Sequence, residues 1–240
     1  MAALLVGLAT FVSTLLGGAF ALRFKDKLHL ILGFSAGAVI GVAFFDLLPQ
    51  AAALAGHQQG IASVTAIAAL GFMLYMILDR AVVIHTGGEE GMGGHRVRGR
   101  LSAGSLAIHS FLDGAAIGLG FQVSTAVGLI VAIAVLAHDF SDGINTVSAV
   151  LKNSGTRAEA LRWLFLDAVA PVLGVAATLF YTLPDNVLGI VLALFSGFFI
   201  YIGASDLLPE SYHGHPTKLT TLMTLVGAAL LYVVVKLGGA

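Results

Sequence analysis

Charged residues are scarce in this chain. Of its 240 residues only 10% are charged, whereas 58% are hydrophobic. A soluble domain averages about 25% charged residues, so the chain has too little polar surface for water. This shortage argues against an ordinary soluble domain and indicates an integral membrane protein. The net charge is -1 and the basic residues are scattered along the sequence, so no nucleic-acid partner is expected.

Cysteine is absent altogether. Its absence excludes a disulfide framework and a thiolate ligand, and it leaves the redox compartment open. Any metal ion bound by this chain must therefore be held by nitrogen and oxygen atoms.

Long apolar segments are what the sequence has in abundance. Each is about 20 residues long, enough to cross a hydrocarbon core of roughly 30 Å. We predict an all-α integral membrane protein with eight transmembrane helices, forming a single polytopic membrane domain over residues 1–240. The first segment has no basic region before it, so we interpret it as a membrane helix and not as a cleaved signal. The predicted spans are Ala2–Leu22, Leu28–Leu48, Ile61–Ile84, Leu101–Val123, Ala126–Val150, Ala160–Leu183, Val187–Leu208 and Leu219–Val235.

The basic residues are distributed unevenly about these spans. All of the 12 Lys and Arg residues except Lys236 fall on one predicted side of the membrane. By the positive-inside rule that side is cytoplasmic. We therefore expect both termini to be extracytoplasmic. The loop at about residues 85–100, which contains His85 and His95, is expected to be cytoplasmic.

The sequence also repeats itself. The second span ends with Asp-Leu-Leu-Pro-Gln at Asp46–Gln50, and the seventh ends with Asp-Leu-Leu-Pro-Glu at Asp206–Glu210. These spans are an odd number of crossings apart, so the two copies cross the membrane in opposite directions. We predict an inverted repeat of helices 1–3 and 6–8 around a central pair, helices 4 and 5.

The central pair carries the polar residues that point to chemistry. The pattern H-x-F-x-D-G occurs at His109–Gly114 and again at His138–Gly143, near the middle of the fourth and fifth spans. Residues i and i+4 share one face of a helix, so each copy offers an imidazole and a carboxylate to the same point. The candidate metal ligands are His109, Asp113, His138, Asp139 and Asp142.

A compensating cation would explain this cluster. Three aspartates at mid-membrane cost on the order of 8 to 10 kcal/mol on insertion scales. Interhelical hydrogen bonds average only about 0.6 kcal/mol, too little to account for them. No Lys or Arg lies at that depth, which leaves a metal ion, protonated carboxylates or water in a cavity. Two imidazoles with two or three carboxylates suit Zn, Fe(II) or Mn(II) and do not rank these ions.

The two copies of the pattern resemble the signatures of a known family. His109–Gly118 is similar to the fourth-helix HN-x-x-[DE]G signature of the ZIP (Zrt/Irt-like protein) divalent metal transporters, and His138–Asp142 to the fifth-helix [HQ]-[END]-x-P-[HE] signature. Tyr201–Glu210 also resembles this family, and the resemblance covers nearly the whole chain. It implies eight transmembrane helices with both ends outside. It also implies metal import toward the cytoplasm and a metal site between helices four and five.

The resemblance assigns roles residue by residue. Asp139 matches a ligand of the family's second metal position, with Asp113 and Asp142 as candidate bridges. The residues that match its first metal position are His109, Asp113, His138 and Asp142.

Two departures bear on the second position. Ser110 stands where the family commonly has Asn, and Ala170 where some members place a sixth-helix carboxylate. Asp167, one turn before Ala170, is a candidate substitute for that carboxylate. The candidate pathway residues are Ser110, Asp167, Asp46, Asp206 and Glu210.

We therefore predict transmembrane uptake of divalent transition-metal ions toward the cytoplasm. The resemblance favours zinc, with Fe, Mn and Cd as further substrates, and no separate cofactor is expected. The expected partners are the metal ion and the lipid bilayer, and the expected location is the plasma (inner) membrane. Small-residue faces on nearly every helix would allow a homodimer but do not require one.

Two other functions fit parts of the pattern. An intramembrane metal-dependent hydrolase would use the ion to activate water, with Asp139 as general base. The symmetric duplication of the motif favours a passage over such a one-sided active site, so no enzyme is expected. A metal sensor or scaffold would need a soluble domain to signal through, and none is recognisable in this sequence.

Overall fold

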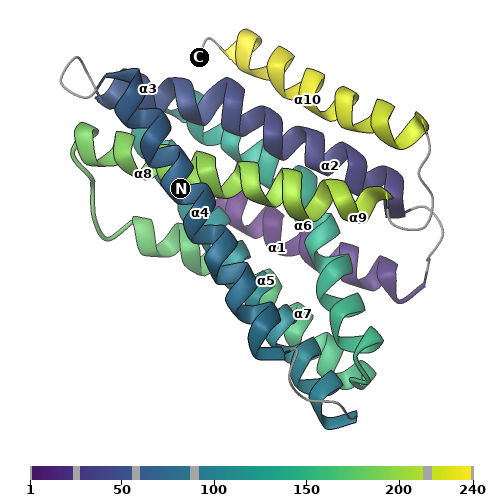
Figure 1. Cartoon of the computed structure of the whole chain (residues 1–240). Coiled ribbons are helices and arrows are strands. Elements are labelled where there is room, and N and C mark those ends of the chain that lie inside the picture. Colours follow the sequence, from purple (N-terminus) through teal and green to yellow (C-terminus); the bar gives the residue numbers. More distant parts are fainter. Residues whose placement is uncertain (1, 24–27, 56–59, 87–91, 213–217, 239–240) are drawn as a thin grey trace.

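The computed structural model describes residues 2–23, 28–55, 60–86, 92–212 and 218–238. These residues form helices joined by short connections, without a strand among them (Figure 1). Within these described ranges, eight helical stretches are long and apolar enough to cross a membrane, as the hydropathy of the sequence predicts. The helical segments are α1 (Ala2–Ala21), α2 (Leu28–Val42), η1 (Ala43–Leu47), α3 (Leu48–Ala55), α4 (Ile61–Thr86), α5 (Met92–Val123), α6 (Thr125–Lys152), α7 (Arg157–Thr178), α8 (Asp185–Tyr201), η2 (Ile202–Leu207), α9 (Leu208–Tyr212) and α10 (Lys218–Gly238).

Two predicted boundaries were wrong. The expected loop at residues 85–100 is helical at both ends, because α4 continues to Thr86 and α5 begins at Met92. Residues 87–91 lie outside the described residues. Hydropathy reports where a helix enters the hydrocarbon and not where the helix begins, so the polar first turns of α5 escaped prediction.

The sixth span ends earlier than predicted, at Thr178 instead of Leu183. Pro184 disfavours a helical conformation in the residue before it. The side chain of Gln122 bonds the freed backbone groups: it donates to the carbonyls of Thr178 (3.0 Å) and Tyr181 (2.9 Å) and accepts from the N–H of Leu183 (3.1 Å). A side chain from α5 thus stabilises this early end of α7.

Two π-helical segments interrupt the second and seventh spans, and hydropathy gave no sign of them. Segment η1 precedes Leu48-Pro49, and η2 precedes Leu208-Pro209. A proline inside a helix has no N–H to donate and crowds the carbonyl four residues earlier, which favours a wider turn there. The widened turns occur at corresponding places in the two copies of the repeated sequence. The inverted relation of the two halves stays a prediction.

The spans pack as two groups of helices. Helices α1, α5, α6 and α7 contact one another and form what we call the α5/α6 bundle. Helix α10 lies along α2, and α4 packs against α8, with α3 against α8 and η2 against both α2 and α8; these form the α2/α8 bundle (Figure 1). The two bundles meet mainly where α2 and α10 contact α6 and where α4 and α8 contact α5.

Glycines bring helix backbones into direct contact inside the bundles. A methyl group on Gly143 of α6 would collide with the carbonyl oxygen of Thr14 on α1, and one on Gly114 of α5 with that of Pro171 on α7. Small residues allow this close approach in membranes, where packing rather than the hydrophobic effect holds helices together. These two glycines therefore serve close packing of the helices.

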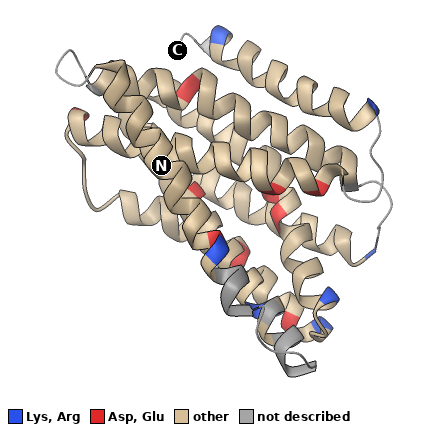
Figure 2. Ribbon diagram, viewed as in Figure 1, with Lys and Arg blue, Asp and Glu red and all other residues tan. Residues whose placement is uncertain are grey.

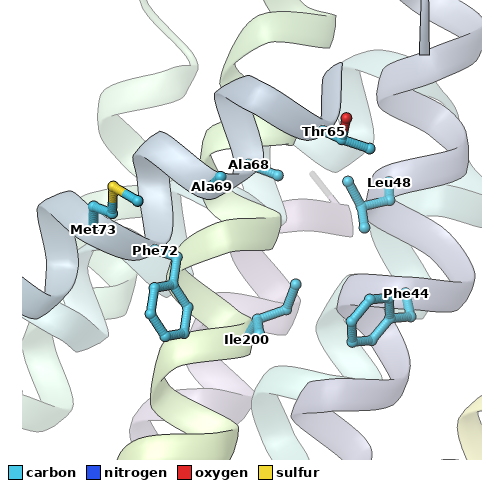
Figure 3. A pocket seen from close by; sticks show the side chains of 8 residues that line it. All are labelled: Phe44, Leu48, Thr65, Ala68, Ala69, Phe72, Met73 and Ile200. Carbon is cyan, nitrogen blue, oxygen red and sulfur yellow. The ribbon is translucent and has the colours of Figure 1, made fainter. Parts of the chain in front are cut away.

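The outer surface suits an apolar solvent. Large hydrophobic side chains such as Phe180 and Leu237 are largely exposed. Most Lys and Arg positions lie toward helix ends, whereas several acidic positions lie part-way along the helices (Figure 2). A hollow of about 290 Å³ opens between the second, third and seventh spans (Figure 3). Its lining is Phe44, Leu48, Thr65, Ala68, Ala69, Phe72, Met73 and Ile200, none of which is acidic, basic or a histidine.

Candidate metal centre

Helices α5 and α6 bring their two polar motifs together. His109 and Asp113 are one turn apart on α5, and His138 and Asp142 are one turn apart on α6. Each of the four offers one ligand atom, and these atoms lie within 4.8 Å of one another. All four side chains are buried, with at most 3% of their surface exposed. The spacing within each helix and the contact between the helices together create a single polar point inside the molecule.

The distances show that the two imidazoles face the same pair of carboxylates. Asp113 Oδ2 lies 3.1 Å from His109 Nε2 and 3.2 Å from His138 Nε2. Asp142 Oδ2 lies 3.5 Å and 3.8 Å from the same two nitrogens. A cation among these atoms would be reached by both histidines and both aspartates.

Several polar atoms of these four side chains have no hydrogen-bond partner. His138 Nδ1 lies 2.9 Å from the carbonyl oxygen of Ala134, so Nδ1 donates there and Nε2 keeps its lone pair for an ion. Within the described residues, the buried atoms without a hydrogen-bond partner include His109 Nε2, Asp113 Oδ1 and Asp142 Oδ2. Unpaired buried polar atoms are costly, so their concentration here indicates that a ligand belongs among them.

Asp139 was predicted as a fifth metal ligand, but it does not join the group of four. It is fully buried on α6, and neither of its carboxylate oxygens has a hydrogen-bond partner among the described residues. Its side chain therefore also lacks a compensating group.

Asp167 lies beside the centre in a complete hydrogen-bond network. Ser110 Oγ donates to its Oδ1 at 2.6 Å, and Thr146 Oγ1 donates to its Oδ2 at 2.7 Å. All three side chains are fully buried, and they come from α5, α6 and α7. Sequence reasoning singled out Ser110 and Asp167 but missed Thr146, because a threonine in an apolar helix carries no distinguishing pattern.

The other candidate pathway residues lie outside the group of four. Asp46, in η1, is fully buried and neither carboxylate oxygen has a partner among the described residues. Asp206, in η2, is exposed. Glu210, in α9, is also exposed, and its Oε1 lies 3.9 Å from Lys152 Nζ on α6.

Two aromatic residues from the α2/α8 bundle complete the surroundings of the histidines. Tyr75 of α4 lies edge-on to the ring of His109, and Phe199 of α8 lies edge-on to the ring of His138. The ring centroids are 6.1 Å apart in both pairs. Neither aromatic was predicted, since aromatic residues in apolar helices are usually ordinary packing residues.

The donor atoms define the chemistry that this arrangement can support. Two imidazole nitrogens and two carboxylate oxygens, with no sulfur, suit zinc and other divalent first-row ions. The fold and the site together are those of a polytopic helical membrane protein with a candidate metal centre buried between two of its spans.

Comparison with known proteins gives the family. A protein-family model, described as ZIP Zinc transporter, matches residues 84–235 of this chain. The chain is 33% identical to the zinc transporter ZupT of Chlorobium luteolum, over 92% of this chain and 93% of that protein. The chain belongs to the ZIP zinc transporter family.

Longer relatives match the chain over a shorter stretch. It is 32% identical to human zinc transporter ZIP6 over 44% of this chain, and 34% identical to the metal cation symporter ZIP8 of Rattus norvegicus over 43%. These matches cover 14% of ZIP6 and 22% of ZIP8. The matched stretch thus spans less than a quarter of the length of these two relatives.

Proposed function

We propose that this chain transports divalent metal ions across the membrane through the centre between α5 and α6. The observation that carries the proposal is the group of four buried ligand atoms within 4.8 Å, several of them without a hydrogen-bond partner. The proposed ligands are His109, Asp113, His138 and Asp142, with zinc as the first substrate because the relative that matches along almost its whole length is named a zinc transporter.

The alternative, an intramembrane hydrolase, is not favoured. The family model and the full-length relative are both described as zinc transporters, which is not an enzymatic function. A hydrolase would also need water at the ion and a general base beside it.

Movement between the two bundles would carry the ion across. The centre lies wholly within the α5/α6 bundle, and close glycine contacts such as Gly143 to Thr14 join helices inside this bundle. Such a bundle can move as one body against its neighbour, which exposes a fixed site to one side of the membrane at a time. In this scheme the ion loses its water as it enters the centre and regains it on release.

We also propose supporting roles for the acidic residues around the centre. Asp139, Ser110 and Asp167 would line a second, adjacent position on the ion's path, supported by the unpaired oxygens of Asp139. Asp46 would serve near one end of the path, and Asp206 and Glu210 near the other.

Orientation and context follow from the distribution of charge. We propose a single polytopic membrane domain in the plasma (inner) membrane with both termini extracytoplasmic, supported by the asymmetry of Lys and Arg in the sequence. Fe, Mn and Cd are proposed as further substrates because imidazole and carboxylate accept them as well. A homodimer is compatible with the small-residue helix faces.

Uptake of radioactive zinc into proteoliposomes tests the proposal. Wild-type protein is compared with His138→Ala and Asp142→Ala, with Fe(II), Mn(II) and Cd(II) as competitors. We expect both variants to lose uptake, because each removes one of four ligands. Asp185→Ala, at the exposed start of α8, is the matched control and should transport normally. Absent uptake by folded wild-type protein, or full uptake by both ligand variants, would overturn the proposed function or the proposed site.

A further inference from the structure

The two histidines of the centre are held in different ways. His138 is oriented by its own helix, through the 2.9 Å contact between Nδ1 and the carbonyl of Ala134. Among the described residues, the polar contacts of His109 are those of its Nε2 with Asp113 (3.1 Å) and Asp142 (3.5 Å), both members of the four-residue group. A metal-binding histidine almost always has a second partner like the carbonyl of Ala134, which fixes the ring for the ion. The ring of His109 is instead in contact with an aromatic side chain from another helix.

Tyr75 is the aromatic residue that contacts the ring of His109, with 6.1 Å between the ring centroids. Its ring meets the ring of His109 edge-on, with an interplanar angle of 84°. Tyr75 is only 9% exposed and is packed against Phe198 (5.6 Å between centroids) and Tyr201 (5.5 Å). The Tyr201 hydroxyl in turn donates to Asp79 Oδ2 at 2.9 Å. The position of the tyrosine ring is therefore fixed by these contacts, and the ring can restrict the orientation of the His109 imidazole.

This contact crosses the boundary between the two bundles. Tyr75 lies on α4 of the α2/α8 bundle, whereas His109 lies on α5 of the α5/α6 bundle. The contact that orients His138 is internal to α6 and would travel with it. If the bundles separate, His138 keeps its orienting partner and His109 loses its own.

We propose that Tyr75 is a positioning residue that fixes His109 for the ion only while the two bundles are docked as they are here. The centre then binds its ion with both imidazoles in this arrangement and more weakly once the bundles have moved apart. The movement that exposes the ion would thus also lower the affinity of the centre for it. The inference rests on the proposed function, because it assumes that the centre binds a transported ion.

Zinc affinity of the purified full-length protein tests the role of Tyr75. Titration calorimetry on wild type, Tyr75→Phe and Tyr75→Leu separates the ring from the hydroxyl. Tyr75→Phe keeps the ring and should bind as wild type does, whereas Tyr75→Leu should bind about tenfold more weakly, as expected for loss of an outer partner of a metal ligand. Phe195→Leu is the matched control: Phe195 is a buried aromatic on α8 that contacts Phe198, and its loss should leave zinc affinity unchanged.

The number of imidazoles on the ion separates positioning from a general loss of packing. X-ray absorption at the zinc edge should show two imidazoles in wild type and in Tyr75→Phe. In zinc-saturated Tyr75→Leu it should show one, matching His109→Ala. Tyr75→Met replaces Tyr75→Leu if the leucine variant fails to fold.

Equal zinc affinity in folded Tyr75→Leu and wild type would overturn this inference, as would a weaker affinity with two imidazoles still bound. Wild-type protein that binds no zinc would instead overturn the proposed function, so the two failures are distinguishable.

Discussion

At the scale of single residues, the structure separates carboxylates that have partners from those that lack them. Asp167 is fully buried, and each of its oxygens accepts a hydrogen bond, from Ser110 or from Thr146. Asp139 and Asp46 are equally buried, and their oxygens have no partner among the described residues. The first arrangement stabilises the fold, whereas the second indicates that a cation, a proton or water supplies what the protein does not.

The bond from Thr146 to Asp167 gives a prediction about stability. Thr146→Val keeps the shape of the side chain but removes the hydroxyl donor, which leaves Asp167 Oδ2 without a partner in the interior. We expect a loss of about 1 to 3 kcal/mol in the free energy of unfolding, measured by denaturation in detergent.

Thr10→Val is the matched control for this change. Thr10 is also fully buried, but its hydroxyl donates to the carbonyl of Gly7 in its own helix. Such a local bond adds little to a helix, so the control should lose much less stability. Equal losses in the two variants would show that the bond to Asp167 has no special weight.

At the scale of helices, contact between backbones decides how the spans pack. Gly143 allows α6 to reach the backbone of α1 at Thr14, and its position directly after the second H-x-F-x-D motif places this contact beside the centre. The same helix that carries His138 and Asp142 is thereby held against its neighbour. One segment of α6 therefore carries both the packing contact with α1 and two of the candidate metal ligands.

Gly143→Ala tests this packing. The added methyl group would collide with the carbonyl of Thr14, so α1 and α6 would have to separate. We expect a loss of about 1 to 3 kcal/mol, the usual cost of overpacking, together with reduced zinc uptake. Thermal unfolding in detergent and proteoliposome uptake measure the two effects.

Gly104→Ala, on α5, is the control for that substitution. The nearest atoms that its methyl group would meet belong to the ring of Trp163 at 3.6 Å, which is ordinary van der Waals contact. Stability and uptake should stay at wild-type levels. A similar loss in both variants would mean that alanine in these helices, and not the contact with α1, is responsible.

At the scale of the whole molecule, the absence of cysteine makes the proposed bundle movement directly testable. Ser35 of α2 and Ser141 of α6 lie on opposite sides of the bundle boundary, with their hydroxyl oxygens 3.1 Å apart. Cysteines at both positions would be close enough to form a disulfide, and the chain has no other thiol.

Oxidation of the Ser35→Cys/Ser141→Cys protein with diamide, which introduces no metal, should lock the bundles together. We expect zinc uptake to fall by at least about tenfold after oxidation and to recover after reduction, because transport requires the bundles to move relative to each other. Each single variant should be unaffected by the oxidant. Normal uptake by a fully cross-linked sample would exclude movement at this boundary as the transport step.

Much of the fold and part of the site could be predicted from the sequence, because both depend on local order. Hydropathy determined the eight spans, and the i, i+4 spacing placed His109 with Asp113 and His138 with Asp142 on single helix faces. The cost of aspartates at mid-membrane singled these residues out as candidates for a metal site. Each of these inferences needs only residues that are near one another in the chain.

Contacts between distant segments needed the tertiary structure. It decided that Asp139 stays outside the group of four, that Thr146 bonds Asp167, and that Tyr75 meets His109 across the bundle boundary. The partners in the last two contacts come from different helices, so no periodicity connects them. The sequence determined which residues could bind an ion, and the packing of helices decided which of them meet and what holds them in place.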